Sequence, residues 1–72
     1  MKQTVDARGL SCPQPVLLAV QAMRQAGQGE IEVLVDNEAS RENVSRAAAS
    51  QGWNVTVSET GTGEFALALS KA

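Results

Sequence analysis

The residue best suited to chemistry in this 72-residue chain is its only cysteine, Cys12. Two prolines follow it, Pro13 and Pro15, and an apolar run over residues 16–20 begins where they stop. Proline is tolerated in the first turn of a helix, because the amide hydrogen that it lacks would have no intrahelical partner there. The pattern therefore predicts a helix with the thiol at its amino end. Such a position lowers the pKa of a thiol from about 8.5 into a range of about 3.5–7.5.

The rest of the composition restricts what this thiol can do. The chain has no histidine, which excludes a Cys–His nucleophile pair and a metal site with histidine ligands. A dithiol oxidoreductase needs a second cysteine to close a disulfide, and this chain has none. We therefore expect no metal, no bound cofactor and no self-contained enzymatic turnover. A reactive Cys12 would therefore have to exchange with a group on another protein. The competing interpretation is a buried, inert cysteine.

Charge and hydropathy exclude several classes of protein. The net charge is −2, and one Trp and one Phe are the only aromatic residues, which argues against a direct partner among nucleic acids. No stretch approaches the ~20 apolar residues that span a bilayer, and residues 1–6 lack the apolar core of a signal peptide. We expect a cytoplasmic protein with no membrane partner. Residues 1–72 should form a single domain with one modest core of aliphatic and alanine side chains.

The first half of the chain predicts a strand, a helix and a second strand. A short strand is expected over residues 3–6, after which Gly9 permits a tight turn toward the cysteine. The helix should run from Pro13 or Pro15 to Gln25 and end at the glycines that follow. Candidates for its cap are Ser11, Cys12 and Gln14, and we favour Cys12 just outside the first turn. Leu17 and Leu18 should widen the apolar surface that the helix lays on a sheet.

The second half predicts a strand over residues 30–35 and a helix from Ser40, its cap, to Gln51, with Gly52 after it. Strands over 53–58 and 65–69 should form a hairpin around the glycine-rich turn 60–63. The order is β-α-β-α-β-β. The expected fold class is an α/β (α+β) two-layer sandwich, with a four-stranded mixed sheet and both helices on one face.

Residues 6–16 also carry a resemblance to a known family. The string Asp6-x-Arg8-Gly9-Leu10-x-Cys12-Pro13-x-Pro15-Val16 resembles the small sulfur carriers known as TusA, SirA and YedF. The resemblance implies that Cys12 carries sulfur, and that Pro13 and Pro15 start and orient the helix. It implies a turn at Gly9 and a structural role for Asp6. Arg8 could add positive charge near the thiol or be a solvated loop side chain.

The resemblance also implies a function and partners. Cys12 would accept a persulfide sulfur from a donor, such as a cysteine desulfurase or a rhodanese-like protein, and relay it to an acceptor protein. The pathway could be tRNA thiolation, cofactor sulfuration or selenium metabolism. Residues 36–38 and 41–44 are most similar to the YedF-like branch, whose members commonly carry a second, larger domain. The alternative function is a non-catalytic interaction or regulatory module in which the cysteine is dispensable, so that a Cys12→Ala variant would still complement a deletion.

Three other groups of residues allow two interpretations each. Asp36 and Glu38 could form an acid pair near the thiol or belong to a solvated loop. Gly61 and Gly63 could cradle a phosphate, but a turn between strands is the simpler interpretation, since phosphate loops lead into helices. The side chains of three arginines should lie on solvated helix faces or contact partners: Arg24, Arg41 and Arg46.

Overall fold

The computed structural model describes residues 2–10 and 14–71, with only the backbone of Lys2. The helices and strands in this part of the chain are β1 (Lys2–Asp6), α1 (Gln14–Ala26), β2 (Gly29–Val35), α2 (Glu38–Ser50), β3 (Asn54–Gly61) and β4 (Glu64–Lys71). Their order confirms the predicted β-α-β-α-β-β arrangement. Neither helix described is long and apolar enough to cross a membrane.

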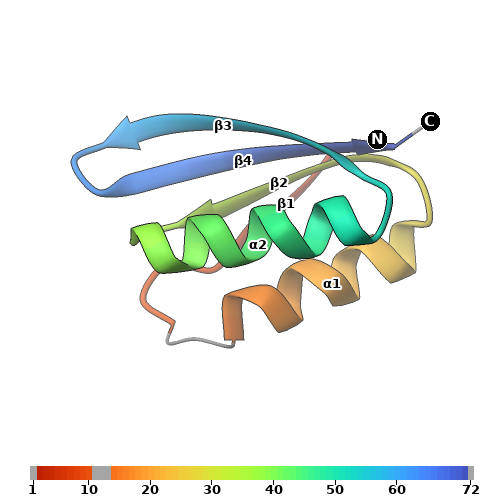
Figure 1. Ribbon diagram of the computed structural model, residues 1–72, viewed down its shortest axis with the longest axis horizontal. Helices are drawn as coiled ribbons and strands as arrows, with labels where there is room; N and C mark the ends of the chain where they lie inside the picture. Colours follow the sequence, from red (N-terminus) through yellow and green to blue (C-terminus); the bar gives the residue numbers. More distant parts are fainter. Residues whose placement is uncertain (1, 11–13, 72) are drawn as a thin grey trace.

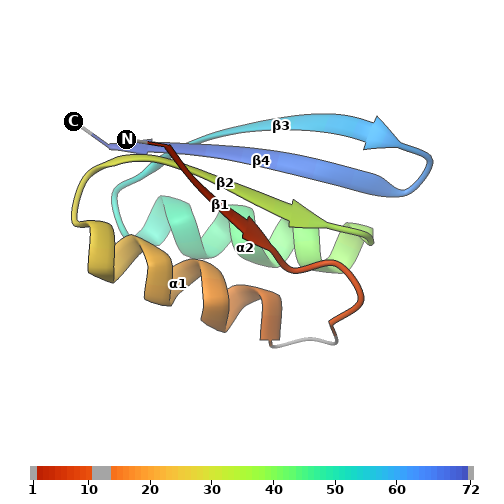
Figure 2. The same ribbon diagram turned by 180° about the vertical axis from the view of Figure 1, so that it is seen from behind.

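The four strands form one mixed sheet in the order β1-β2-β4-β3. β1 and β2 are parallel, whereas β4 pairs antiparallel with both β2 and β3. A parallel pair needs a crossover connection, and α1 provides it. Both helices cover the same face of the sheet (Figures 1 and 2), with α1 against β1 and β2 and α2 against β3 and β4. The predicted two-layer sandwich is therefore confirmed.

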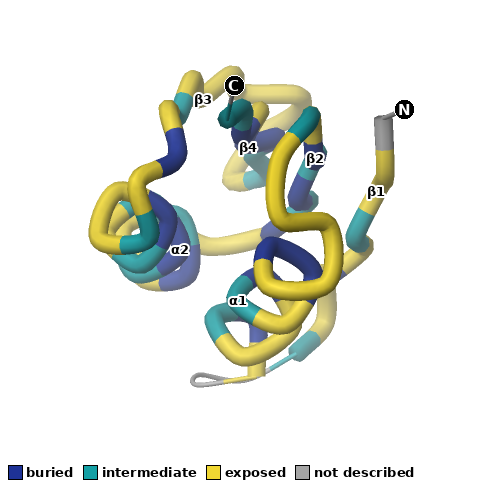
Figure 3. The backbone as a smooth tube through the Cα atoms, turned by 90° about the vertical axis from the view of Figure 1, so that its right-hand side faces the viewer, coloured by how far each residue is buried: buried dark blue, intermediate teal, exposed yellow. Residues whose placement is uncertain are grey.

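The core lies between the sheet and the two helices (Figure 3). Alternate residues of the central strands point into it, so that Ile31 pairs with Leu69 and Val33 with Leu67. The helices contribute mostly alanine, together with one large side chain from α1, Met23, which is 2% exposed. Small side chains let the helices approach the sheet and each other closely. The core is aliphatic and alanine-rich as predicted, apart from the buried Trp53 just before β3.

The start of α2 differs from the prediction. Ser40 was expected to cap this helix, but the cap is Asn37, whose backbone is extended (φ −158°, ψ 160°) and whose side chain accepts a hydrogen bond from the Ser40 amide. Asn and Ser are comparable caps, so the cap preference of the residue alone cannot choose between them. The earlier start also places the acidic Glu38 in the first turn, where the helix dipole favours a negative charge.

The hairpin is longer than predicted. β3 extends to Gly61 and β4 begins at Glu64, which leaves Thr62 and Gly63 as the turn, with Gly63 at φ 76°. The pairing register of β3 and β4 shifts between Glu59 and Gly61, which is a β-bulge or similar irregularity next to the turn. Gly61 ends β3 and Gly63 lies in the turn, so this segment joins two strands, as the simpler interpretation predicts.

Candidate functional site

Both helices begin at the same end of the molecule, the end at which the parallel strands β1 and β2 finish (Figures 1 and 2). The chain leaves β1 through residues 7–10 and enters α1 at Gln14, two positions after Cys12. Cys12 and Pro13 lie outside the described residues. The predicted placement of the thiol just before the first turn therefore stays a prediction, and Gln14, which is already helical, is not the cap.

The segment that leads to Cys12 is held by hydrogen bonds at three consecutive residues. The amide of Ala7, a residue that is 1% exposed, donates to the carbonyl oxygen of Leu34 (2.8 Å). The Arg8 amide donates to the Asp6 carboxylate (3.1 Å), and the Gly9 amide donates to Oδ2 of Asp36 (2.7 Å). Leu10, the next residue, packs against the core. The approach to the cysteine is thus an ordered turn.

Asp6 and Arg8 form a two-point ion pair on this turn. Nε of Arg8 donates to Oδ1 and Nη2 donates to Oδ2, each at 2.9 Å. The side-chain hydrogen bonds from Arg8, followed by the one from its amide, lower the pKa of Asp6 to about 2, and Asp6 in turn raises the pKa of Arg8. Nη1 of Arg8 also lies 3.9 Å from Oε1 of Glu64, at the start of β4. The Arg8 charge is therefore largely compensated by acids, and its side chain is not simply solvated.

The backbone conformation at position 9 favours glycine. Its φ is 78°, in the left-handed region that side chains disfavour, although a Cβ built there would meet nothing within 4 Å. In this conformation its amide reaches Asp36, the residue that follows β2. Asp36 also accepts a hydrogen bond from the Asn37 side chain (3.2 Å). Asp36 is exposed but engaged with the turn, whereas Glu38 begins α2 with an exposed side chain. An acid pair of Asp36 and Glu38 stays a prediction.

The outward face of α1 differs from the prediction. Leu17 and Leu18 were expected to pack on the sheet, but they are 61% and 36% exposed. The buried residues of α1 are Pro15, Ala19, Ala22 and Met23. At 100° per residue these four share one side of the helix, and Leu17 lies about 200° from Pro15, on the far side. Val16 and Val20 contact the core only in part.

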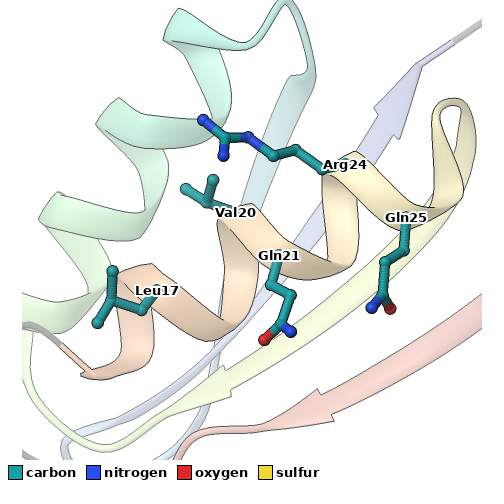
Figure 4. Close-up of a pocket in the computed structure, with 5 residues that line it drawn as sticks. All are labelled: Leu17, Val20, Gln21, Arg24 and Gln25. Carbon is teal, nitrogen blue, oxygen red and sulfur yellow. The ribbon is translucent and has the colours of Figure 1, made fainter.

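A shallow depression runs along this outward face. It is lined by Leu17, Val20, Gln21, Arg24 and Gln25 (Figure 4). Leu17, Val20 and Arg24 project along the side nearer α2, and the two glutamines project along the other side. α1 contains no acidic residue, although the whole chain has a net charge of −2. The helix that begins after Cys12 thus presents an apolar and slightly basic surface.

The three helical arginines behave differently from one another. Arg24 is exposed on α1 as predicted, and Arg46 is exposed and pairs with Glu42 one turn away (2.9 Å). Arg41 is half-buried, with its guanidinium 5.3 Å from the centre of the Phe65 ring, so the prediction of a solvated side chain is wrong there. The cation–π contact with β4 could not be read from a helical pattern.

Within residues 2–10 and 14–71, no cluster of three or more Cys, Asp or Glu side chains could hold a metal ion. The expectation that the protein works without a metal or cofactor stays a prediction. The same holds for the roles expected of Cys12 and Pro13, while Pro15 is observed in the first turn of α1 with its ring buried.

Comparison with known proteins identifies the family. The family model described as sulfurtransferase TusA matches residues 3–71. A protein of Methanocaldococcus jannaschii that is named as a candidate sulfur carrier is 32% identical over 68 residues, which are 93% of this chain and 91% of that protein. The crystal structure of a SirA-like protein from Desulfitobacterium hafniense superposes with a TM-score of 0.91 at 34% identity, covering 100% of this chain and 99% of the other. The YedF-like branch stays a prediction. The chain belongs to the TusA sulfurtransferase family, and a role as a sulfur carrier that meets donor and acceptor proteins follows from that membership.

Proposed function

We propose that the protein carries sulfur as a persulfide on Cys12, accepting it from one protein and delivering it to another. The observation that supports this most directly is the combination of a single thiol with an ordered turn before it and a helix start after it. Cys12 is the only cysteine of the chain, and residues 7–9 before it are held by hydrogen bonds. Helix α1 begins at Gln14, two positions after Cys12.

The transfer needs no oxidant. The Cys12 thiolate attacks the terminal sulfur of a donor persulfide, so that a new S–S bond forms on Cys12, the donor S–S bond breaks and the donor leaves as a thiolate. Delivery repeats the same exchange with the acceptor thiolate as the attacking group. Because the chain holds no second cysteine, the loaded sulfur cannot be lost to an internal disulfide. The donor class that fits this chemistry is a cysteine desulfurase or a rhodanese-like protein.

The outward face of α1 is the surface on which these partners would dock. Leu17 and Leu18 follow Cys12 by five and six residues and are exposed, whereas the other large apolar side chains of residues 3–10 and 14–71, apart from Val57, are buried or half-buried. An apolar surface close to the start of α1 excludes water when a partner covers it. Arg24 and the absence of acids on α1 favour a partner whose contact surface is apolar with acidic groups near it. Donor and acceptor would use this surface in turn.

Intact mass spectrometry tests the proposal. The purified protein is incubated with a cysteine desulfurase, pyridoxal phosphate and cysteine, and in parallel with polysulfide, with a Cys12→Ser variant as control. We expect a gain of one sulfur atom that a reductant removes and that the control lacks. Loading from polysulfide alone would identify a different donor class. Failure to load from either source would refute the carrier proposal and favour the interaction module in which Cys12 is dispensable.

A further inference from the structure

A continuous chain of hydrogen bonds joins the start of α2 to the turn before Cys12. The Ser40 amide donates to Oδ1 of Asn37 (2.7 Å), and Nδ2 of Asn37 donates to Oδ1 of Asp36 (3.2 Å). The other oxygen of Asp36, Oδ2, accepts from the Gly9 amide (2.7 Å). The Asp36 carboxylate therefore connects the helix cap with a turn that lies 27 residues earlier in the sequence.

This contact is close to the reacting sulfur along the chain. Gly9 is three positions before Cys12, and a fully extended chain covers at most about 3.6 Å per residue, so the intervening chain spans at most about 11 Å. Hydrogen bonds to an ionised acceptor are about twice as strong as those between neutral groups. A displaced Asp36 would release a fixed point in the backbone near Cys12.

The other fixed points of the turn are supplied by different groups. Asp6 and Glu64 are occupied with the Arg8 side chain, and Ala7 is bonded to the backbone of β2. Only the Asp36 contact ties the turn to the junction of β2 and α2 through a side chain, among the hydrogen bonds described for residues 7–10. That junction is in turn anchored by the capped start of α2.

We propose that Asp36 is a positioning residue for sulfur transfer: by accepting the Gly9 amide it holds the turn that sets the approach of Cys12 to the start of α1. This inference rests on the proposed function of Cys12. Asp36 does not touch the transferred sulfur in this scheme. It acts through the backbone of residues 9–10, and the Asn37 side chain keeps its carboxylate oriented.

Three substitutions of Asp36 distinguish the effect of its hydrogen-bond acceptor from the effect of its charge. Asp36→Asn removes the negative charge and keeps a carbonyl oxygen that can accept from Gly9. Asp36→Glu keeps the charge and moves the acceptor by one methylene, and Asp36→Ala removes both. Glu38→Gln serves as the matched control, because it removes a nearby exposed carboxylate on the first residue of α2. Asp36 is exposed, so all four variants should fold, and thermal unfolding checks this.

The readout is the rate at which iodoacetamide alkylates Cys12, measured as a function of pH. Loss of the hydrogen bond between the Gly9 amide and Asp36 should raise the midpoint of this profile toward that of a free thiol in the Ala and Glu variants. The Asn variant keeps one acceptor oxygen for the Gly9 amide and should change less than these two, and Glu38→Gln should match the unsubstituted protein. A rise of about 0.5–1 pH unit slows alkylation about three- to tenfold below the midpoint. The Ala and Glu variants should also deliver persulfide sulfur more slowly than the unsubstituted protein. Hydrogen exchange at the Gly9 amide should be faster in these two variants.

Two results would overturn the inference. If Asp36→Ala and Asp36→Glu keep the original profile, Asp36 does not position the thiol. If the Asn and Ala variants both move the midpoint downward while the Glu variant does not, Asp36 acts through its charge on the thiolate. Failure of the proposed function is a separate outcome, because it appears as a lack of sulfur loading in the unsubstituted protein, whatever the alkylation profiles show.

Discussion

Replacing Leu17 with glutamine should weaken sulfur transfer without weakening the fold. The Leu17 side chain is 61% exposed on the outward face of α1. Complete burial of a leucine contributes about 1.5–3 kcal/mol. If a partner covers the exposed part of the side chain, the loss is about 1–2 kcal/mol, which corresponds to about a 5- to 30-fold increase in the Kd of the complex.

The assay is the rate of sulfur loading from a donor as a function of carrier concentration. Leu17→Gln should raise KM about 5- to 30-fold and leave kcat nearly unchanged, because the contact is equally present in the ground state and the transition state. Thermal unfolding should stay close to that of the original protein, since glutamine is a good helix former and the site is on the surface.

A matched control is available on β3, the edge strand of the sheet that lies away from α1. Val57 on β3 is 39% exposed, and β3 is the strand farthest from β1 in the strand order, away from the strands that α1 covers. Val57→Thr should leave KM within twofold of the original value. An unchanged KM for Leu17→Gln, or an equal increase for both variants, would refute the docking surface on α1.

Three further predictions concern stability. Asp6 has a pKa of about 2 in the folded protein, lowered from the ordinary value of 3.8, so its ion pair stabilises the fold above pH 3.8 and this contribution is lost as the pH falls toward 2. Urea unfolding of Asp6→Asn should differ from the original protein at pH 6 and converge with it near pH 2; a constant difference would contradict the assignment. Met23→Ala should cost about 2–5 kcal/mol of unfolding free energy, because Met23 is 2% exposed in the core, and a cost below about 1 kcal/mol would show that the core refills the space. Asn37→Ala should cost about 0.5–2 kcal/mol through loss of the α2 cap, measured by the same unfolding, with Ser50→Ala at the other end of α2 as a control of small effect.

The order of the helices and strands could be predicted because hydrophobic periodicity reports burial directly. Residues 31, 33 and 35 alternate with polar or partly exposed neighbours, and their side chains are the ones buried against the helices. Helix ends were less predictable. Asn37 and Ser40 both suit a helix cap, and the choice between them depends on the path of the chain after β2, which local composition does not specify.

The exposed face of α1 shows a second limit of prediction from hydrophobic periodicity. Residues 16–20 are all apolar, so periodicity allows several orientations of the helix. The packing of Ala19 and Met23 against the sheet selected one orientation and left Leu17 outside. The apolar run identified a helix at this place, but only the packed structure showed that Leu17 and Leu18 remain exposed.

By itself, the sequence determined the class of fold and restricted the chemistry proposed for Cys12. One thiol and no histidine exclude several reactions, the prolines at the start of an apolar run predict where the thiol lies, and periodicity predicts the two-layer sandwich. Tertiary structure alone decided which groups hold the turn before the thiol: Asp36 reaches Gly9 from 27 residues away, and Glu64 approaches Arg8 from β4. The physical reason is that periodicity encodes which side of an element is buried. The strand order β1-β2-β4-β3, which brings these ends together, is set by packing across the whole sheet.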